Sequence, residues 1–439
     1  MNQYLRNFGN TLLLKGTLTT LATGTILAPG LITPVSAELE DSPKALVDEV
    51  WQIVNNEYVD GEFTQSEWQE IREELLSQDY TSKKQAYQAI VQALEELGDP
   101  YTRFLTPEQF AVLTSKTSGE LSGVGVRLGQ DQHTRDLIVI ESLKNSPATA
   151  AGIKSGDRLV RIDGKPTALM SLEDAVKAIQ GEVGTEVSLQ ISRSGEATFE
   201  VTLTRANIEV ASVEYKVKDE GSLRVGYIKL DEFSSHAAEQ MKEAIEQFHS
   251  EEVSGMVLDL RGNPGGLLFA SVDIARMFIK DGEIVHTIDR KGGDRQFSAD
   301  NSTLTDLPLV VLVNENSASA SEILAGALKE SGRATVVGTN TYGKGTVQSV
   351  HSLSDGSGVA VTMARYYPPS GIDINHVGIT PNIEQNLTSD QQRRLQADPS
   401  LFATNADPQY SRAISILKSS PITSPFGSEN ITPNPVSIR

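Results

Sequence analysis

Residues 309–338 read LVVLVNENSASASEILAGALKESGRATVVG, and this stretch decides the fold of the chain. It begins with five apolar residues, continues with apolar residues at helical spacing and closes with a second short apolar run. The pattern predicts a buried strand, a helix and another strand in succession. The same alternation starts upstream at Val225, and the predicted elements are strands over 225–230, 256–260, 309–313 and 335–337 and helices over 237–248, 268–279 and 320–329.

Alternating strands and helices favour a layered α/β core, and ligands gather at the carboxyl ends of its strands. Two other patterns precede this core. Apolar residues recur at helical spacing from Ala45 to Leu97, and short strands separated by turn signals fill the region from Glu108 to Arg205. The predicted class is therefore a multidomain α+β protein. The expected parts are a leader over 1–37, a helical unit over 38–107, a β module over 108–206, the α/β core over 207–386 and a polar, partly disordered tail over 387–439.

The composition excludes several classes of function. The chain has 439 residues, a formal net charge of −20 at pH 7 and no cysteine. An acidic excess of this size repels phosphate backbones, so we expect no nucleic-acid partner. The lack of cysteine excludes disulfides, thiolate zinc sites and a cysteine nucleophile.

The first residues have the pattern of an export signal. They include Arg6 and Lys15 but no acidic residue, an apolar stretch over 18–32 and a small-residue ending at Ala37. This pattern predicts cleavage before Glu38 and a working place outside the cytoplasm. The periplasm and the thylakoid lumen both fit, and peripheral membrane association is left open.

Three serines follow the predicted strand over 309–313 and are candidates for a nucleophile. Ser317, Ser319 and Ser321 lie where the strand meets the helix, a place that presents a hydroxyl beside helix-end N–H groups. Ser319 and Glu322 also form the capping box S-x-x-E, which needs no catalysis to exist. Spacing alone leaves plain capping open and does not separate the serines. A serine needs a base, and among His133, His236, His249, His286, His351 and His376 the best placed is His236, near a strand end.

Lys344 is the other candidate base, and it also completes a phosphate-loop pattern. Residues 338–344 match G-x-x-x-x-G-K after an apolar strand, which makes a nucleotide hydrolase one alternative. A phosphate loop needs Ser or Thr next and then a helix. Here Gly345 follows, and residues 346–350 alternate like a strand, so we expect no nucleotide partner.

A lysine base must lose its proton near neutral pH. An ordinary lysine has a pKa of about 10.4, and lowering it to about 7 costs about 4.6 kcal/mol, which only burial can supply. Serine–lysine pairs are a known variant of the catalytic triad. Gln348 is expected on the same strand face as Lys344, where its amide would orient the amine. The alternative for Lys344 is a solvated surface lysine.

A glycine-rich turn supplies a third feature. Residues 258–266 read LDLRGNPGG, a strand that runs into a turn before a helix. Such turns expose consecutive backbone N–H groups that bind anions. Together with an amide at the serine junction, one of them could hold a developing oxyanion. The alternative is a tight turn with no further role.

The order and spacing of these motifs resemble the carboxyl-terminal processing proteases, a serine peptidase family. The motifs are DLRGNPGG, ASASEI and GKGTVQ, whose lysine follows the serine by 25 residues. SGVGV at 122–126 and the turns that follow are similar to the PDZ domain of these proteases. The resemblance runs over residues 45–382 and departs from the family pattern at Gly262, where Asn is usual, and at Asn382, where an acid is usual.

The resemblance implies a role for each matched residue. Ser319 would be the nucleophile, Lys344 the general base and Gln348 its orienting partner. The backbone amides of Gly265 and Ala320 would form the oxyanion hole. The acidic chain and its Glu-rich helical unit are most similar to the cyanobacterial and chloroplast branch.

The sequence therefore predicts an exported serine endopeptidase that recognises and cleaves the carboxyl-terminal region of protein substrates, without metal, nucleotide or other cofactor. Substrate tails are expected to bind the PDZ module as an added strand. A non-catalytic PDZ adaptor that binds tails without cutting them is the alternative, and the oligomeric state is left open. The expected tail-binding residues are Gly123, Val124, Gly125 and Val126 in the loop and Leu172, Val176 and Ile179 on the helix.

Overall fold

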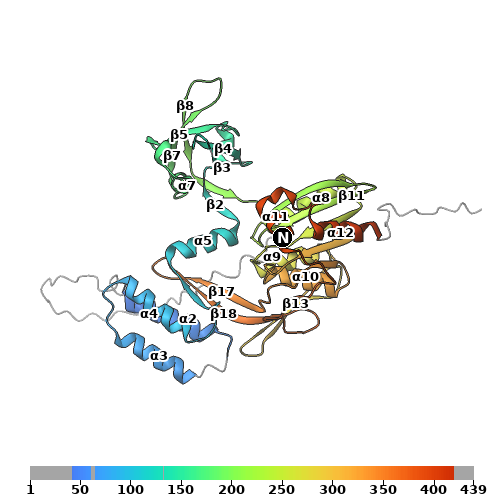
Figure 1. The fold of residues 1–439 in the computed structure, drawn as a ribbon. Coiled ribbons are helices and arrows are strands. Elements are labelled where there is room, and N and C mark those ends of the chain that lie inside the picture. The colour runs from blue at the N-terminus through green and yellow to red at the C-terminus, as the bar shows by residue number, and fades with distance from the viewer. Residues whose placement is uncertain (1–41, 61–64, 132, 420–439) are drawn as a thin grey trace, which may run out of the picture.

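The computed structural model describes residues 42–60, 65–131 and 133–419, so the predicted leader lies outside the described residues. The described part of the chain forms a helical unit, a β module and a large α/β core (Figure 1). The predicted multidomain class is confirmed. None of the helices in these described ranges is long and apolar enough to cross a membrane.

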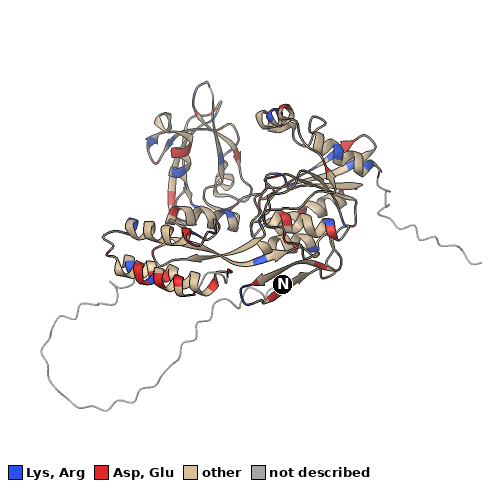
Figure 2. Cartoon of the chain, turned by 60° about the horizontal axis from the view of Figure 1, so that its bottom comes forward, with Lys and Arg blue, Asp and Glu red and all other residues tan. Residues whose placement is uncertain are grey.

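Three helices form the amino-terminal unit, namely α2 (Pro43–Glu57), α3 (Gln65–Ser77) and α4 (Lys83–Glu95). The side chains of Ser42 and Ser82 cap α2 and α4, as N-cap preferences predict. Acidic residues gather on this unit (Figure 2), and they account for part of the negative charge of the chain. The buried faces of the helices share one hydrophobic cluster with Val359 and Val361, which come from the core.

The β module stands apart from the core at the end of a two-stranded ribbon (Figure 1). Its sheet has the order β3-β4-β5-β7-β8, β6 pairs with β5, and α7 packs against β3 and β5. The ribbon pairs β2 with β9 in antiparallel fashion and follows α5. The bounds are α5 (Pro107–Ser118), β2 (Glu120–Gly123), β3 (Val126–Gln130), β4 (Leu137–Ser142), α6 (Pro147–Ala150), β5 (Arg158–Ile162), β6 (Lys165–Pro166), η1 (Thr167–Leu169), α7 (Leu172–Ile179), β7 (Glu186–Ser192), β8 (Phe199–Thr204) and β9 (Ala206–Glu209).

The core is built on a six-stranded sheet in the order β10-β11-β12-β15-β16-β19. Its strands are β10 (Val213–Glu220), β11 (Leu223–Leu230), β12 (Gly255–Asp259), β15 (Leu309–Val313), β16 (Thr335–Gly338) and β19 (Ile383–Glu384). All neighbours pair in parallel except β10 with β11. The helices α8 (Ala237–Ser250), α9 (Leu268–Arg276) and α10 (Ala320–Glu330) pack on one face. The predicted alternation is confirmed.

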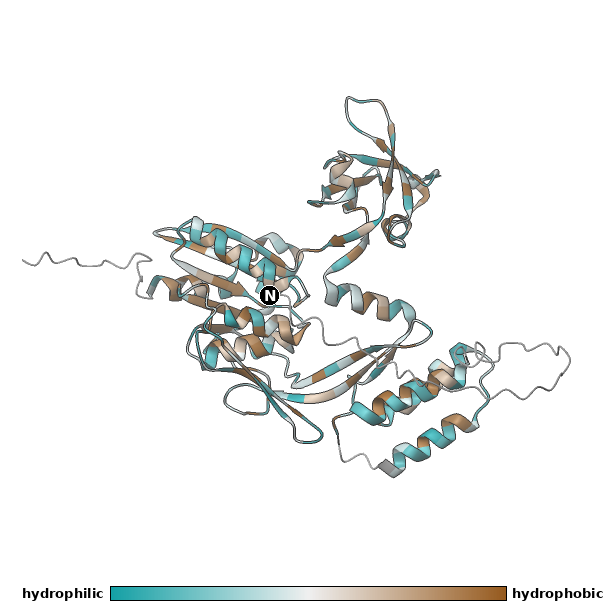
Figure 3. Ribbon diagram, turned by 180° about the vertical axis from the view of Figure 1, so that it is seen from behind, coloured by the Kyte–Doolittle hydropathy of each residue, from teal (hydrophilic) through white to brown (hydrophobic). Residues whose placement is uncertain are grey.

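A second sheet joins the core to the helical unit. It contains β1 (Arg103–Leu105), β13 (Glu283–Asp289), β14 (Asp294–Ser298), β17 (Thr346–Ser352) and β18 (Gly358–Tyr367). Its order is β1-β18-β13-β14, with β17 paired to β18. The long β17–β18 hairpin runs from the core to the amino-terminal helices (Figure 3). The strand β1, which follows those helices, therefore lies in one sheet with the segment that follows Lys344.

The chain also folds in part of the predicted tail. Residues 389–419 form α11 (Ser389–Ala397), η2 (Pro399–Leu401) and α12 (Pro408–Ser419), while residues 420–439 lie outside the described part. Tyr410 and Leu417 of α12 are buried on the second face of the core sheet. The buried guanidinium of Arg261 bonds both Asp259 and Asp407, which ties α12 to the glycine-rich turn. The prediction of a polar, partly disordered tail rested on overall polarity and did not recognise the apolar face of α12.

Candidate active site

The structure separates the three serines that spacing alone does not. The hydroxyl of Ser317 donates to the carbonyl oxygen of Leu260 at 2.8 Å, and that of Ser321 donates to the carbonyl oxygen of Asn263 at 3.0 Å. Both serines are fully buried, whereas Ser319 is partly exposed. Ser319 is therefore the serine that a substrate can reach.

Ser319 has an unusual backbone conformation at the junction of β15 and α10. Its φ is 53° and its ψ is −113°, a region that residues with a side chain rarely occupy. Such strain costs about 1–3 kcal/mol and persists where the surroundings enforce it. Gly265 lies against this residue, because a Cβ at Gly265 would be only 2.9 Å from the Cβ of Ser319. The close approach explains why glycine occupies this position in the turn.

Asn263 joins the glycine-rich turn to the serine junction. Its side-chain amide donates to the carbonyl oxygen of Leu230 at 2.9 Å, and its backbone oxygen accepts the N–H of Ala318 at 3.0 Å. Its side-chain oxygen accepts the N–H of Gly265 at 2.8 Å. The predicted oxyanion donor Gly265 is thus beside Ser319, but its N–H points to Asn263 in this conformation. Ala320 is the first residue of α10, so its N–H has no acceptor within the helix.

The carboxylate of Glu322 holds the serine and lysine segments together. It accepts the backbone N–H groups of Ser319 at 2.8 Å, Gly343 at 2.7 Å and Lys344 at 2.9 Å. The hydroxyl of Thr341 adds a fourth hydrogen bond at 2.6 Å. Burial raises the pKa of Glu322, and these four hydrogen bonds oppose the rise. The predicted capping box is therefore one part of a larger clamp between two segments.

Sequence reasoning recognised Glu322 only as a capping partner. A signal was available in the sequence, because Glu322 directly precedes the run ILAGAL at 323–328 and acidic side chains are rarely fully buried without partners. An acid beside such a run indicates a buried hydrogen-bond network.

Tyr366 of β18 makes a second link between the same segments. Its hydroxyl lies within hydrogen-bonding distance of two carbonyl oxygens, that of Ser319 at 3.1 Å and that of Lys344. The ring is fully buried, and burial raises the pKa of Tyr366 well above its ordinary value. The hydroxyl therefore stays protonated and can act as a donor. Tyr366 lies in the region that carries the family resemblance, but the sequence gave it no role.

Lys344 lies in a sheltered environment close to the serine junction. Burial, with a smaller contribution from Arg103, lowers the pKa of its amine from 10.5 to about 8, against the opposing effects of Asp99 and Glu322. The amine lies 4.7 Å from the centroid of the Tyr101 ring. In the described residues, no hydrogen bond joins this amine to the hydroxyl of Ser319. The lysine is thus half-buried, its pKa is lowered toward neutral pH, and its amine lies over the Tyr101 ring.

Gln348 is near Lys344 but does not bind its amine in this conformation. The side-chain amide of Gln348 donates to the hydroxyl of Thr346 at 2.9 Å and to that of Thr362 at 3.2 Å. A register shift between Val347 and Gln348 interrupts the strand alternation on which the predicted shared face depended.

The structure argues against the two alternative chemistries. The N–H groups of Gly343 and Lys344, which a phosphate loop would offer to a nucleotide, both bind the Glu322 carboxylate. Residues 339–345 do not lead into a helix. His236 lies at the start of α8 and contacts Glu120 of the ribbon at 3.3 Å. Neither feature brings a nucleotide or a histidine to Ser319.

The structure buries four of the predicted tail-binding residues and leaves three at least partly exposed. The buried ones are Gly123, Val124, Gly125 and Ile179, and the others are Val126, Leu172 and Val176. Gly125 has a φ of 79°, and a Cβ there would lie only 2.2 Å from the Cβ of Ser146. On the helix, Leu172 is partly buried and Val176 is exposed, but Ile179 lies in the core of the module. A peptide between β3 and α7 would therefore meet Leu172 and Val176 rather than Ile179.

Comparison with known proteins identifies the class that this fold and site define. The profile of Peptidase family S41 matches residues 224–385, and the profile of the PDZ domain matches residues 112–192. These two regions correspond to the α/β core and to the β module with its ribbon. The protein is a PDZ-containing serine peptidase.

Relatives place the chain more finely. A carboxyl-terminal-processing protease of Synechocystis sp. is 40% identical over 389 residues, which cover 88% of this chain and 89% of that protein. The chloroplastic carboxyl-terminal-processing peptidase 2 of Arabidopsis thaliana is 40% identical over 372 residues, covering 80% of this chain and 72% of that protein. A solved photosystem II D1 C-terminal processing protease has 36% identity and a TM-score of 0.52, covering 84% of this chain and 99% of that one. The chain belongs to the carboxyl-terminal-processing proteases of peptidase family S41.

Proposed function

We propose that the protein cleaves the carboxyl-terminal region of exported proteins with a dyad of Ser319 and Lys344. The single observation that carries this proposal is the clamp of Glu322, which binds the backbone N–H groups of both residues at 2.8 and 2.9 Å. A plain helix cap would need only the first of these bonds.

In the proposed reaction the neutral amine of Lys344 takes the proton of the Ser319 hydroxyl as its oxygen attacks the scissile carbonyl carbon. The carbonyl electron pair moves to the oxygen, and this oxyanion then reforms the carbonyl as the C–N bond breaks. The protonated amine of Lys344 gives its proton to the leaving amine. Water next attacks the acyl ester with Lys344 as base, and the proton returns to the serine oxygen. The long side chain of the lysine allows the amine to move from the Tyr101 ring to Ser319.

The oxyanion would be held by backbone N–H groups, each worth about 3–4 kcal/mol in the transition state. Ala320 at the start of α10 supplies one. Gly265 supplies the second if its N–H turns from Asn263 toward the substrate. Its φ is 109°, and glycine has no Cβ that would restrict such a rotation of the peptide.

The PDZ module binds protein substrates, and we propose that it captures their tails before cleavage. Export is supported by the leader pattern of residues 1–37 and by relatives from cyanobacteria and chloroplasts. We propose the periplasm or the thylakoid lumen as the compartment. The solved relative is named for C-terminal processing of photosystem II D1, and we propose a carboxyl-terminal tail of this kind as one substrate class.

Two measurements test this function. The purified protein is incubated with a protein that ends in an apolar tail, and mass spectrometry reads whether a new amino terminus forms. Cleavage supports the peptidase, whereas retention of the intact protein indicates the adaptor. Comparing exported proteins from cells with and without the gene then identifies carboxyl termini that are longer in its absence.

A further inference from the structure

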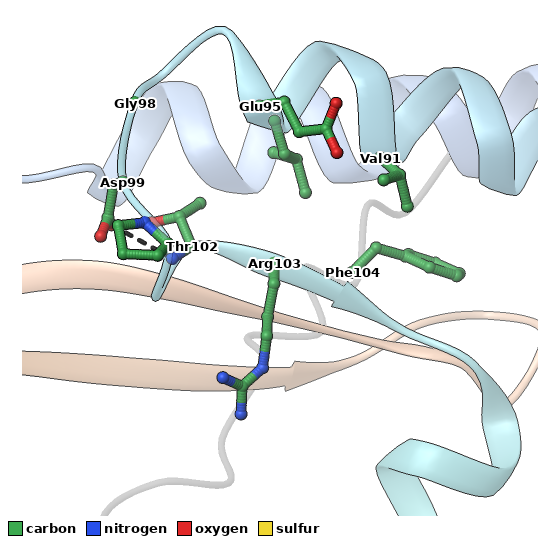
Figure 4. Close-up of a pocket in the computed structure, with 9 residues that line it drawn as sticks. Val91, Glu95, Gly98, Asp99, Thr102, Arg103 and Phe104 are labelled. Atoms are coloured by element: carbon green, nitrogen blue, oxygen red, sulfur yellow. Dashed lines mark hydrogen bonds between the residues drawn. The ribbon is translucent and has the colours of Figure 1, made fainter.

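A turn of the helical unit reaches the lysine of the proposed dyad. Residues 98–102 connect α4 to β1, and the carboxylate of Asp99 fixes their path. It accepts the N–H groups of Tyr101 at 3.0 Å and Thr102 at 3.1 Å. Figure 4 shows Asp99 bonded within this turn and Arg103 extending away from α4, across the strands of the hairpin. A cavity of about 420 Å³ lies between this turn and α4, and its walls include Val91, Leu94 and Phe104.

Asp99 also ties the turn to the core. It accepts a hydrogen bond from the hydroxyl of Thr362 at 2.6 Å, and the hydroxyl oxygen of Thr102 accepts the backbone N–H of Thr362 at 3.0 Å. Thr362 in turn accepts from the side-chain amide of Gln348. The turn is therefore fixed directly to β18 and, through Thr362, to Gln348 of β17, so several hydrogen bonds determine its position relative to the lysine.

Tyr101 lies at the tip of this turn, over the amine of Lys344. The amine is 4.7 Å from the ring centroid, and Tyr342 on the lysine segment interacts with the phenol. Burial, aided by Tyr342, raises the pKa of Tyr101 to about 12, so the ring stays neutral at the pH values at which the lysine titrates. Tyr101 thus covers the amine from the side of the helical unit.

We propose that Tyr101 is a positioning residue for the base of the dyad: its ring is the wall that keeps water from the Lys344 amine, so the helical amino-terminal unit completes the active site. This inference rests on the proposed function, because it assigns Tyr101 a role in preparing that base. It explains why β1 and the hairpin share a sheet. Without the turn, the amine would face solvent on the side where the ring now lies.

Charged and titratable groups surround the same amine from five segments of the chain. Arg103 lowers the pKa of Lys344 and Asp99 and Glu322 raise it, so their effects partly cancel. Burial is the largest cause of the lowered pKa. The largest effect of removing the ring should therefore come from added water rather than from a lost charge. The groups are Asp99 in the turn, Arg103 on β1, Glu322 on α10, Tyr342 on the lysine segment and Tyr366 on β18.

An aromatic ring can also act in the opposite direction. A ring face attracts a cation by about 0.5–2 kcal/mol, which would favour the protonated lysine. If that attraction dominated, removing the ring would lower the pKa of Lys344. If shielding from water dominates, as we propose, removing it raises the pKa. The sign of the change therefore decides between the two roles.

The test measures the lysine itself, without needing cleavage. In the full chain carrying Ser319→Ala, trace acetic anhydride labels amines across a pH series, and mass spectrometry of the peptide that contains Lys344 gives the neutral fraction at each pH. Tyr101→Ala should raise the pKa by about one unit, which is about tenfold less neutral amine near pH 7. Tyr101→Phe keeps the ring and should change the neutral amine less than about threefold.

Tyr87→Ala is the matched control, since Tyr87 also joins the helical unit to the hairpin, through a 2.6 Å hydrogen bond to Asp355. It should leave the titration of Lys344 unchanged. An unchanged or lowered pKa in Tyr101→Ala, with a folded circular dichroism spectrum, would overturn the inference. So would an equal rise in Tyr87→Ala. The function has its own check in the chain that retains Ser319: if Lys344→Ala still cleaves a quenched fluorescent peptide that ends in alanines, the dyad is wrong whatever the labelling gives.

Discussion

The serine and lysine sides of the site are built in different ways. Ser319 sits between a fully buried parallel strand and α10, and Asn263 fixes the neighbouring turn from within the same core. Lys344 precedes the β17–β18 hairpin, which belongs to a second sheet and packs on the amino-terminal helices. The proposed nucleophile is therefore part of the core, while the proposed base depends on the helical unit as well as on the hairpin.

This difference indicates where the site can be adjusted. Only two side chains, Glu322 and Tyr366, bond the backbones of both Ser319 and Lys344 in the described residues. The amine itself lies over the Tyr101 ring, and the proposed reaction needs it to turn toward the serine. If Ser319 is held by the core while the surroundings of Lys344 depend on the helical unit, activity can depend on how that unit packs.

The largest effect is expected when either side loses its reacting group. Ser319→Ala and Lys344→Ala should each reduce kcat/KM for a peptide with an apolar carboxyl end by about 10⁴-fold or more, because the members of such a unit act together. Lys329→Ala, at the end of α10, is the control and should retain activity. Full activity in either dyad variant would contradict the mechanism.

Removing the clamp should break the link between the two sides. Glu322→Ala leaves the N–H groups of Ser319 and Lys344 without their acceptor, and a displacement of about 1 Å at a reacting group costs about 10²-fold in rate. We expect a fall of that size in kcat, with a lower melting temperature. Glu315→Ala removes an exposed acid near the same sheet edge and should change neither quantity. Wild-type kcat in Glu322→Ala would show that the clamp has no catalytic role.

The pH profile should report the lysine side alone. The pKa of Lys344 is lowered to about 8, and the base acts only when neutral, so kcat/KM should rise with pH and level off above about 8. Below that value the rate should fall about tenfold per pH unit. A profile that levels off near 6.5 would instead indicate a histidine base.

The smallest effect is expected at the second link. Tyr366→Phe removes one hydroxyl shared by the carbonyl oxygens of Ser319 and Lys344, and we expect a loss of about 0.5–1.5 kcal/mol in the free energy of unfolding. Tyr367→Phe is the neighbouring control, since the ring of Tyr367 stacks on His286 at 5.4 Å, away from the two segments. Chemical denaturation measures the free energy of unfolding of both variants. Equal losses in the two variants would remove the special role of Tyr366.

The sequence predicted the serine side better than the lysine side, for physical reasons. Buried parallel strands leave apolar runs that can be read directly, so β12, β15 and the helix after Ser319 were expected. Spacing alone did not choose among the three serines, because the choice depends on hydroxyl groups that bond the carbonyl oxygens of Leu260 and Asn263 across the fold.

The surroundings of Lys344 depend on contacts that no local pattern records. Tyr101 is far away in the chain, and the register shift before Gln348 changed the face on which that side chain lies. The fold of residues 389–419 was missed because charged residues precede the apolar face of α12. Long-range pairing, rather than propensity, sets these features.

A crystal structure with Ser319 joined to a peptide boronate tests the central claim most directly, since the adduct imitates the tetrahedral intermediate. We predict that the Lys344 amine leaves the Tyr101 ring and lies about 2.6–3.2 Å from the serine oxygen, the range of a hydrogen bond between nucleophile and base. An adduct in which the amine stays on the ring, while another side chain bonds the serine oxygen, would contradict the account.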